Sequence, residues 1–584
     1  MPPDLAAETR GLFAFAALLL LPGLLVVRAP WTAVPFLSAA FWIVSWWWGL
    51  PRLAFLHGAL VAFGLLLVLR LVQPEPIGRA TRPGWPALLV CTAAAARLLP
   101  YGAWLVAPGA DMSLHSLSAL LLVWHDGLPR SYEPLLPIHK FGAYTPGLHA
   151  LAADVALLSG LPAYRAAFLV SVGAYGLLQV ALFAALKRFF SPATAALAAV
   201  IGLGLARVPQ AFLGWGANPT VLALAFVVAA AALLSRGTGR SPAVAAGLLL
   251  GAAVLCHTMV AACAVAAFPL VFAAVIALPP DERRRAHERF VIAALIALLA
   301  AAPFLLALHF TLSSGERAWL ADHLRTHYAS DWQLRYARAY PVAVARYVIG
   351  TLNDAFLAVS LAGLLVAFRD RRPEKRRALI ALTATALVLI LLAATARWGG
   401  VGPLVVFPER PMAVLTVILC AGLAFLVEWL LAHRRLLSIA ALTILAATAA
   451  ERANRYYRGG RANVMVGTDD LAAMRWIEGH TGPLDVVCND YGTAGLWVPA
   501  LAGRSISAPH LPPFYFDEFR DGARGRPCAV RYVSTRSFFV APEPREPSAA
   551  AVLFRSGTAT LLAGEPRSLT SFDKAGGNGN PDAP

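Results

Sequence analysis

Asp111 and His115 are the first residues in this sequence whose types and spacing could do chemistry together. They lie four positions apart, so on a helix they would share one face. A carboxylate at the end of a membrane helix is suited to act as a general base toward a hydroxyl. With His115 it could also bind a metal or a phosphate. A structural role stays open, since Asp111 could cap a short helix predicted over 114–124.

A second group of candidates lies in the segment Tyr144–His149, which reads Tyr-Thr-Pro-Gly-Leu-His. Pro146 is typical of the first turn of a helix, and Gly147 permits another segment to approach closely. The first turn of a helix exposes backbone N–H groups that favour an anionic ligand such as phosphate. We therefore expect Tyr144 and His149 to bind substrate.

Further candidates lie in the polar stretch between these two groups and in one later corner of the chain. Glu133, His139 and Lys140 occupy a Pro-rich stretch, and loops held by a scaffold often carry binding sites. His257 stands between two apolar runs. We expect all four residues to contribute to substrate binding, with a buried core histidine as the alternative for His257.

A short loop with charged residues at both ends follows a later apolar run. Arg397 precedes this loop, and Glu409 and Arg410 end it. An arginine between two membrane spans can clamp a phosphate through two parallel hydrogen bonds. The alternative is a structural pair between Glu409 and Arg410.

The composition indicates which scaffold must position these residues. Of the 584 residues, 59% are apolar and only 14% are charged, whereas soluble domains carry about 25% charged residues. Many apolar runs reach the roughly 20 residues that cross a bilayer. The sequence therefore predicts a mainly α, polytopic membrane protein with about 13–14 transmembrane helices. The expected spans lie near 11–27, 33–50, 53–73, 84–107, 164–186, 193–208, 217–235, 242–256, 258–278, 290–309, 346–367, 378–395, 411–431 and 436–450.

Basic clusters in short loops set the orientation, because such clusters stay on the cytoplasmic side. The strongest occupy 281–289 and 369–377, and weaker ones occur at 187–188, 236–240 and 433–435. All fall on one side if the marginal run 145–160 is re-entrant or interfacial. Asp111, His257, Arg410 and the C-terminal region then share the outer face of the cytoplasmic membrane. Together with the spanning pattern, this gives N-terminal transmembrane helices over 1–110, a first large outer loop with interfacial or re-entrant helices over 111–160, and a helical core over 161–450.

The net charge of +17 is explained by these anchoring clusters. Nucleic-acid binding would instead require a basic soluble face with interleaved aromatic residues, so we expect no nucleic-acid partner. The sequence has no P-loop, no Gly-x-Ser-x-Gly and no His-Glu-x-x-His motif. ATP-driven transport and serine hydrolysis therefore receive little support.

The last part of the chain has the composition of a small extracytoplasmic α/β domain, expected over 451–573, before a disordered tail at 574–584. Helices are predicted over 469–480, 496–502 and 549–554, and strands over 484–488, 529–534 and 558–563. Cys488 and Cys528 could form a disulfide if this domain is extracytoplasmic. Whether they do is left open.

The sequence resembles the membrane-integral glycosyltransferases of the GT-C superfamily, which use polyprenyl-phosphate-linked sugars. Asp111 follows an apolar span and begins a large loop, and the segment 144–149 then starts a helix. Residues 486–492 resemble the strand and turn that carry the Trp-Trp-Asp-Tyr-Gly motif of oligosaccharyltransferases. The group also includes protein mannosyltransferases and aminoarabinose transferases.

The resemblance implies an inverting transfer of a hexose or pentose from a polyprenyl-phosphate donor to a glycan, lipid or protein acceptor. Asp111 would deprotonate the acceptor, and Arg397 or Arg410 would stabilise the departing phosphate. Asp490 and Tyr491 would contact substrate, and the aromatic loop 311–345 would cover the donor. No Asp-x-Asp pair occurs in the first loop, so the metal is unknown: no cofactor is certain, and Mg²⁺ or Mn²⁺ stays open.

Two other functions use the same features of the sequence. A glycan polymerase or ligase would share the lipid-linked donor and differ in its acceptor. A transporter or flippase of lipids or polysaccharides would predict internal repeats and ionisable residues near the middle of the bilayer. No clear repeat is visible, and the spans are mostly Ala and Leu without central acidic residues.

Overall fold

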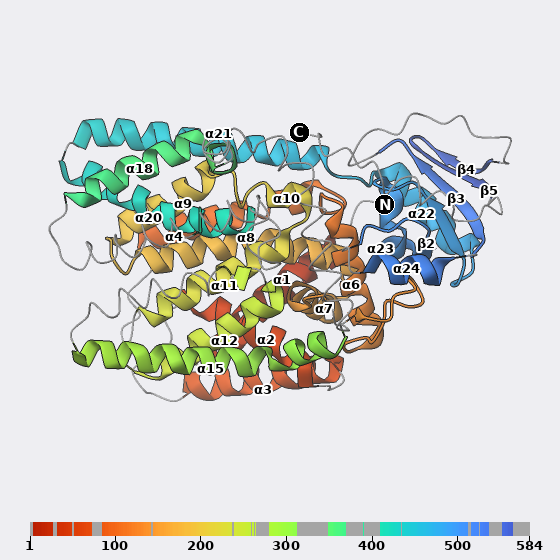
Figure 1. Cartoon of the computed structure of the whole chain (residues 1–584), viewed down its shortest axis with the longest axis horizontal. Helices are drawn as coiled ribbons and strands as arrows, with labels where there is room; N and C mark the ends of the chain where they lie inside the picture. Colours follow the sequence, from red (N-terminus) through yellow and green to blue (C-terminus); the bar gives the residue numbers. More distant parts are fainter. Residues whose placement is uncertain are drawn as a thin grey trace.

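The structure is a computed structural model of the chain. Figure 1 shows a bundle of long helices and, beyond one end of the bundle, a small sheet with short helices. The described residues are 4–26, 32–48, 52–72, 84–141, 144–235, 239–258, 260–261, 263, 280–311, 348–369, 389–390, 409–433, 435–511, 515–524, 526–536 and 552–563.

Helices form where the sequence predicts apolar spans. Six helical stretches among the described residues are long and apolar enough to cross a membrane, and seven shorter apolar helices accompany them. The long stretches belong to α1 (Leu5–Val26), α4 and α5 (Trp85–Ala96 and Leu99–Ala103), α8 (Ala163–Leu186), α15 (Pro280–Thr311), α20 (Glu409–His433) and α21 (Arg435–Ala462). The shorter stretches are Arg52–Leu65 within α3 (Arg52–Val72) and the helices α2 (Val34–Ser45), α7 (Gly147–Ser159), α9 (Pro192–Leu205), α11 (Asn218–Leu234), α12 (Ser241–Cys256) and α18 (Asp354–Phe368).

The predicted mainly α, multi-pass membrane protein is confirmed by these helices. Proline stands in the first turn of α2, α4, α9, α11 and α12, where its missing N–H has no helical partner to lose. Several predicted features lie wholly or largely outside the described residues: the runs 258–278 and 378–395, the loop 311–345, Arg397 and the tail 574–584.

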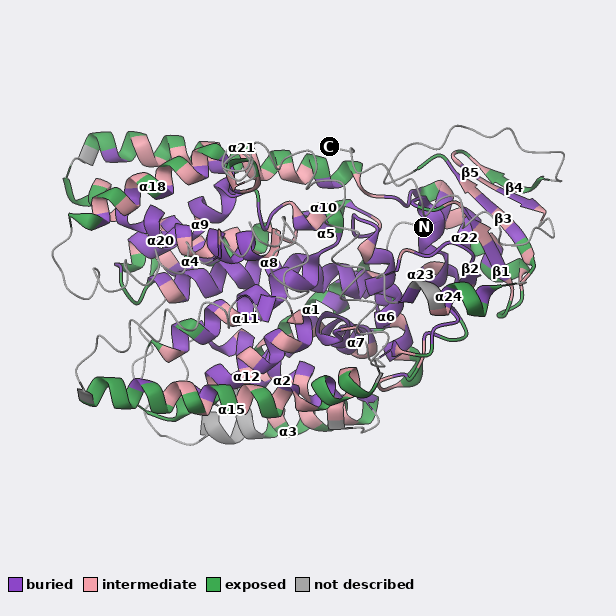
Figure 2. Cartoon of the chain, viewed as in Figure 1, coloured by how far each residue is buried: buried purple, intermediate pink, exposed green. Residues whose placement is uncertain are grey.

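The centre of the bundle is α8, which is buried along nearly its whole length (Figure 2). It packs against α11, α6 (Asp111–His125), α7 and α4. By contrast, α15 leaves Leu295, Leu298 and Leu299 more than half exposed. Apolar side chains exposed along a long helix are what contact with lipid requires, so α15 lies at the periphery of the bundle.

Basic side chains gather at one end of the bundle, which we call the basic end. There an Arg188 Nη2 atom donates to the Ser235 carbonyl oxygen at 2.8 Å. Nearby, Arg240 Nε donates to Glu288 Oε1 at 2.8 Å. The first contact joins the ends of α8 and α11, and the second joins the beginnings of α12 and α15.

The opposite end of the bundle carries the start of α6. Arg165, in the first turn of α8, donates to the carbonyl oxygen of Trp104 at 2.6 Å. Arg10 of α1 donates to the carbonyl oxygen of Ser159, the last residue of α7, at 3.0 Å. The helix α7 therefore ends beside the segment that leads into Asp111, and we call this end of the bundle the Asp111 end.

A buried ion pair fixes α7 to the beginning of α3. Arg52 Nε and Nη2 donate to the two carboxylate oxygens of Asp154, each at 2.7 Å. Both side chains are almost completely buried. The guanidinium also lies over the Trp46 ring, 4.6 Å from its centroid. Such a pair is stable in a dry interior only because both carboxylate oxygens and the guanidinium have partners.

The C-terminal part contains, within the described residues, one five-stranded sheet in the order β2-β1-β3-β5-β4. The strand β1 is parallel to β2 and β3, and β5 is antiparallel to β3 and β4. The strands are β1 (Val486–Asn489), β2 (Ser505–Ile506), β3 (Cys528–Ser534), β4 (Val552–Ser556) and β5 (Ala559–Ala563). The accompanying helices are α22 (Thr468–His480), η4 (Ala494–Trp497), α23 (Val498–Ala502) and α24 (Phe516–Ala523). The predicted small α/β domain is thus confirmed.

The helix predicted over 549–554 is wrong, because its described part begins β4. Val552 pairs with Leu562 of β5, and Gly557, with φ +45°, makes the turn between the two strands. Branched and aromatic side chains favour a strand once a neighbouring strand is available. A run this short does not show a periodicity that separates helix from strand.

The helix α21 carries the chain from the bundle into the α/β domain. It continues beyond the predicted apolar run 436–450 and ends at Ala462. The next residue, Asn463, accepts a hydrogen bond at its carbonyl oxygen from the Gly109 N–H at 3.1 Å. The domain is therefore attached directly beside the turn that precedes Asp111.

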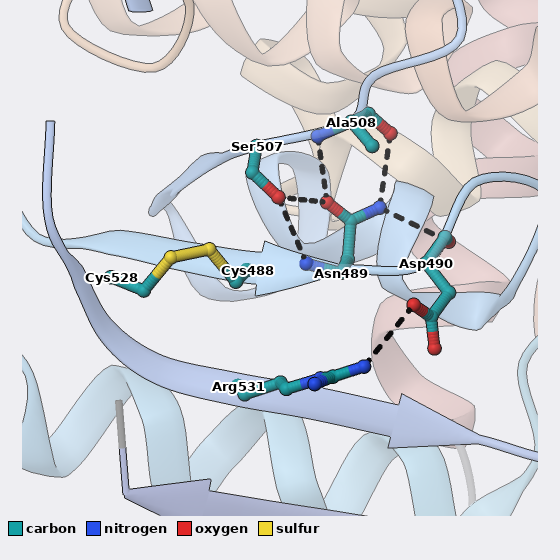
Figure 3. The surroundings of a disulfide bond; sticks show 7 residues. All are labelled: Cys488, Asn489, Asp490, Ser507, Ala508, Cys528 and Arg531. Atoms are coloured by element: carbon teal, nitrogen blue, oxygen red, sulfur yellow. Dashed lines mark hydrogen bonds and ion pairs between the residues drawn. A yellow bond between two sulfur atoms is a disulfide. The ribbon is translucent and has the colours of Figure 1, made fainter. Parts of the chain in front are cut away.

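A disulfide joins Cys488 of β1 to Cys528 of β3 (Figure 3), which decides an alternative that the sequence left open. The other four cysteines are free. We therefore expect alkylation of the unfolded, unreduced protein to modify four cysteines, and all six only after reduction. Mass spectrometry of the labelled peptides provides the measurement, and modification of Cys488 and Cys528 before reduction would contradict the bridge.

We expect Arg52→Met to lower the stability of the bundle by about 3–5 kcal/mol, because it leaves the Asp154 carboxylate buried without its partner. The double variant Arg52→Met/Asp154→Leu should lose less, since it removes both charges. Thermal unfolding in detergent provides the comparison. A double variant that is less stable than the single variant would show that the charge is not the cause.

Candidate active site

Asp111 is the first residue of α6, so its carboxylate lies at the positive end of the helix dipole. Two glycines with left-handed backbones let the chain close around it. A Cβ on Gly109 (φ +93°) would lie 2.2 Å from the Trp215 carbonyl carbon. A Cβ on Gly216 (φ +89°) would lie 3.0 Å from the Asp111 Cβ. The corner between α10 (Phe212–Trp215) and α11 therefore packs directly against the carboxylate-bearing residue.

The Asp111 carboxylate has a hydrogen-bond partner in the C-terminal domain. His510 Nε2 lies 2.8 Å from Asp111 Oδ1, and His510 Nδ1 lies 2.7 Å from the Tyr491 hydroxyl oxygen. The Asp111 side chain is nevertheless 42% exposed. It is thus held on one side and accessible on another, as a general base must be.

The charges around Asp111 keep it ionised. Burial on its own raises the pKa of this carboxyl, but the hydrogen bond from His510 and the electrostatic interactions with His510, His115 and Arg410 bring the pKa below its usual value. Burial lowers the pKa of His115 to about 4, against the opposing effect of Asp111. At neutral pH the site therefore holds a carboxylate beside a neutral imidazole.

His115 and His149 form a buried histidine pair. Their Nδ1 and Nε2 atoms lie 2.9 Å apart, and each residue is only 1% exposed. The Tyr144 ring lies against both imidazoles, with centroid distances of 5.8 Å and 5.7 Å. Three predicted site residues from α6 and from the 144–149 segment thus come together.

The 144–149 segment also brings the His257 corner to the site. The Thr145 hydroxyl donates to the Cys256 carbonyl oxygen at 2.9 Å. A Cβ on Gly147 would lie 2.6 Å from Cys256 Sγ, so the close approach predicted for this glycine is present. His257 follows directly, and it interacts electrostatically with Arg410, His115 and Asp111.

Arg410 enters from the start of α20. Its guanidinium carbon lies 5.0 Å from the Phe212 ring centroid, in cation–π geometry. Its charge acts on Asp111, His115 and Tyr144. Arg410 is thus a cation at the start of α20 that faces Asp111, His115 and Tyr144.

Other predicted residues have separate partners. Glu133 and His139 form an exposed pair at 3.5 Å, and Asp490 pairs with Arg531 at 3.7 Å. Lys140 accepts a hydrogen bond at its carbonyl oxygen from the Tyr515 hydroxyl. Glu409 begins α20. No contact is found between these residues and Asp111 in the described part of the chain.

His510 was not among the predicted residues. It follows β2 in a Pro-flanked loop, and β2 pairs in parallel with β1, which leads to Tyr491. Carboxyl ends of parallel strands meet at one edge of a sheet, which is the signal that could have located it. The strand β2 contains only Ser505 and Ile506, too short to recognise in the sequence.

The described residues contain no group of three or more His, Cys, Asp or Glu side chains arranged to hold a metal ion. Among the described residues near Asp111, the donors are one carboxylate, with Oδ1 bonded to His510, and imidazoles paired with each other. Mg²⁺ and Mn²⁺ prefer several oxygen ligands. This described donor set does not fit them.

No protein-family model matches the chain, and no curated protein matches it by sequence. Solved structures do match. The apo oligosaccharyltransferase of Archaeoglobus fulgidus aligns with TM-score 0.53 and 11% identity, over 78% of this chain and 70% of that one. Apo ArnT from Cupriavidus metallidurans aligns with TM-score 0.52 and 16% identity, over 82% and 98%. AftD from Mycobacteria aligns with TM-score 0.50 and 15% identity, over 81% of this chain but 39% of AftD.

These three proteins are GT-C glycosyltransferases. The alignments cover most of this chain, and at such low sequence identities they show a shared fold. The resemblance predicted from Asp111, the 144–149 segment and the C-terminal domain is confirmed at this level: the chain has a GT-C-like fold.

Proposed function

We propose that this chain is an integral-membrane glycosyltransferase that moves a sugar from a polyprenyl-phosphate donor to an acceptor hydroxyl, with Asp111 as the general base. One observation carries the proposal. In a GT-C-like fold, an ionised and partly accessible carboxylate lies at the bundle end, beside Arg410 and a pair of neutral histidines. Ionisable groups placed there are costly unless they are paired or take part in the function.

The proposed reaction is a single displacement. The acceptor oxygen attacks the anomeric carbon while the bond from that carbon to the donor phosphate oxygen breaks. The acceptor proton passes to the Asp111 carboxylate, and polyprenyl phosphate leaves. A double displacement would need a second carboxylate about 5 Å from the first. Within the described residues, the groups that act most strongly on Asp111 are His510, His115 and Arg410, which favours inversion.

A phosphate leaving group gives Arg410 its proposed role. The developing charge would be stabilised by this guanidinium, which already acts on the groups around Asp111. The ArnT structure from C. metallidurans bound to undecaprenyl phosphate aligns with TM-score 0.51 and 14% identity. That protein binds a polyprenyl phosphate, and we propose the same class of donor here. The acceptor is a hydroxyl of a glycan, lipid or protein.

We place the reaction at the outer face of the cytoplasmic membrane. The basic end, where Arg188 and Arg240 lie, is opposite the Asp111 end, and basic loops stay cytoplasmic. The Cys488–Cys528 disulfide agrees with an oxidising compartment. We accordingly propose that residues 111–160 form an outer loop and that α7 does not cross the membrane.

We expect Asp111→Asn to lower sugar transfer by about 10²–10⁴-fold, because the amide cannot accept the acceptor proton. The assay uses purified protein in lipid with a polyprenyl-phosphate sugar and separates labelled product from donor. Asp521→Asn, at an exposed carboxylate of α24, is the control and should retain activity. Full transfer by the Asp111 variant at normal expression would refute the assignment.

The pH dependence of sugar transfer follows from the direction in which the pKa of Asp111 is shifted. Its pKa lies below the usual value, which is about 3.9, so the ionised base is present above that pH and is lost only as pH falls through it. Because Asp111 stays ionised, we expect kcat/KM to stay at its neutral-pH value down to about pH 4. An acidic limb of kcat/KM centred above about pH 5.5 would contradict a base with a lowered pKa.

A further inference from the structure

We propose that His510, from the C-terminal domain, is a positioning residue that holds Oδ1 of Asp111 and leaves Oδ2 to take the proton of the acceptor hydroxyl. This inference rests on the proposed function and goes beyond it, because it assigns the α/β domain a part in the reaction. The two groups are 399 residues apart in sequence. Only docking of the domain on the Asp111 end brings them together.

The hydrogen bonds determine which ring nitrogen donates to the carboxylate. His510 Nδ1 lies 2.7 Å from the Tyr491 hydroxyl and Nε2 lies 2.8 Å from Asp111 Oδ1. A phenol can donate, and an ionised carboxylate only accepts. If the Tyr491 O–H donates to Nδ1, the neutral ring carries its proton on Nε2 and donates it to Oδ1. Each group in this chain then has a suitable partner.

Tyr491 keeps the proton that this arrangement needs. Burial and the nearby charge of Asp111 raise the pKa of the Tyr491 hydroxyl to about 12. It therefore remains a phenol, and a donor, throughout the neutral range. The hydroxyl acts on the imidazole as the orienting group acts on a catalytic histidine, and the imidazole in turn fixes the carboxylate.

The loop that carries His510 is fixed by the turn that carries Tyr491. Asn489 Oδ1 accepts from the Ala508 N–H at 2.9 Å, and Asn489 Nδ2 donates to the Ala508 carbonyl oxygen at 3.0 Å. The Ser507 hydroxyl oxygen accepts from the Asn489 N–H at 3.1 Å (Figure 3). These hydrogen bonds join the two loops at the ends of β1 and β2 into one unit.

Docking of the domain places this unit over Asp111. Glu518 Oε1 accepts from the His139 N–H at 2.6 Å, and the Tyr515 hydroxyl donates to the Lys140 carbonyl oxygen at 2.8 Å. These contacts come from the same stretch that follows α6. The role of the 139–140 segment in this site is thus to hold the domain, through its backbone.

Several groups face Asp111 from different elements, and each contributes to the pH at which it titrates. The groups that interact most strongly with the carboxylate are His510, His115 and Arg410. The charge of Asp111 acts in turn on the hydroxyls of Tyr144 and Tyr491. Among these, His510 supplies the direct hydrogen bond. Its removal should destabilise the carboxylate form and raise the pKa of Asp111.

The test compares His510→Ala, His510→Gln and Tyr491→Phe in the transfer assay over a range of pH. We expect His510→Ala to lower kcat by about 10- to 100-fold, as for loss of a hydrogen bond to a charged group, and to move the acidic limb to higher pH. His510→Gln should recover most of the rate, because its amide can donate to Oδ1. Tyr491→Phe should shift the limb in the same direction by less, and it serves as the test if His510→Ala does not fold.

The matched control is His433→Ala, an exposed histidine at the far end of α20, which should behave as the unmodified protein. A His510→Ala variant whose rate falls without movement of the acidic limb, and which glutamine does not rescue, would overturn the positioning role. An inactive Asp111→Asn with a fully active His510→Ala would also overturn it while the proposed function stands. An active Asp111→Asn would refute the proposed function itself.

Discussion

The ionised carboxylate of Asp111 is the constraint on which the surrounding structure depends. A carboxylate beside an apolar bundle would take up a proton unless its charge were compensated. Compensation comes from three separate elements: the first turn of α6, His510 from the sheet domain and Arg410 from α20. Because these elements are far apart in the sequence, the charge state of one residue depends on the assembly of the whole Asp111 end.

Close backbone packing makes this assembly possible. Gly109 and Gly216 adopt left-handed conformations where a side chain would collide with the neighbouring segment, and Gly147 lies against Cys256. The Arg52–Asp154 pair then anchors α7 from the other side. The site is therefore built from helix ends and tight turns, while the long apolar helices supply a rigid frame in lipid.

A large part of the fold could be predicted from the sequence, because apolar runs of this length have few alternatives in a membrane. Asp111, His115, Tyr144, His149, His257, Arg410 and Tyr491 were predicted, and the structure brings them to one end of the bundle. Glu133 and His139 were predicted from their polarity in a loop, and Asp490 from the resemblance of 486–492 to a family motif, and all three have partners elsewhere. Polarity alone does not specify which partner a loop residue finds. The short segment at β4 was mistaken for a helix because its pairing with β5 is not visible locally.

The sequence by itself determined the membrane-spanning class, which loops carry the basic clusters and the approximate position of a polar site after the fourth span. These depend on hydrophobic length and charge, which are local properties. Only the tertiary structure decided that the C-terminal domain docks on Asp111 and that His510 completes its hydrogen bonding. The reason is physical: a hydrogen bond between residues 399 positions apart depends on the packing of a sheet edge against helix ends, and no local pattern encodes that packing.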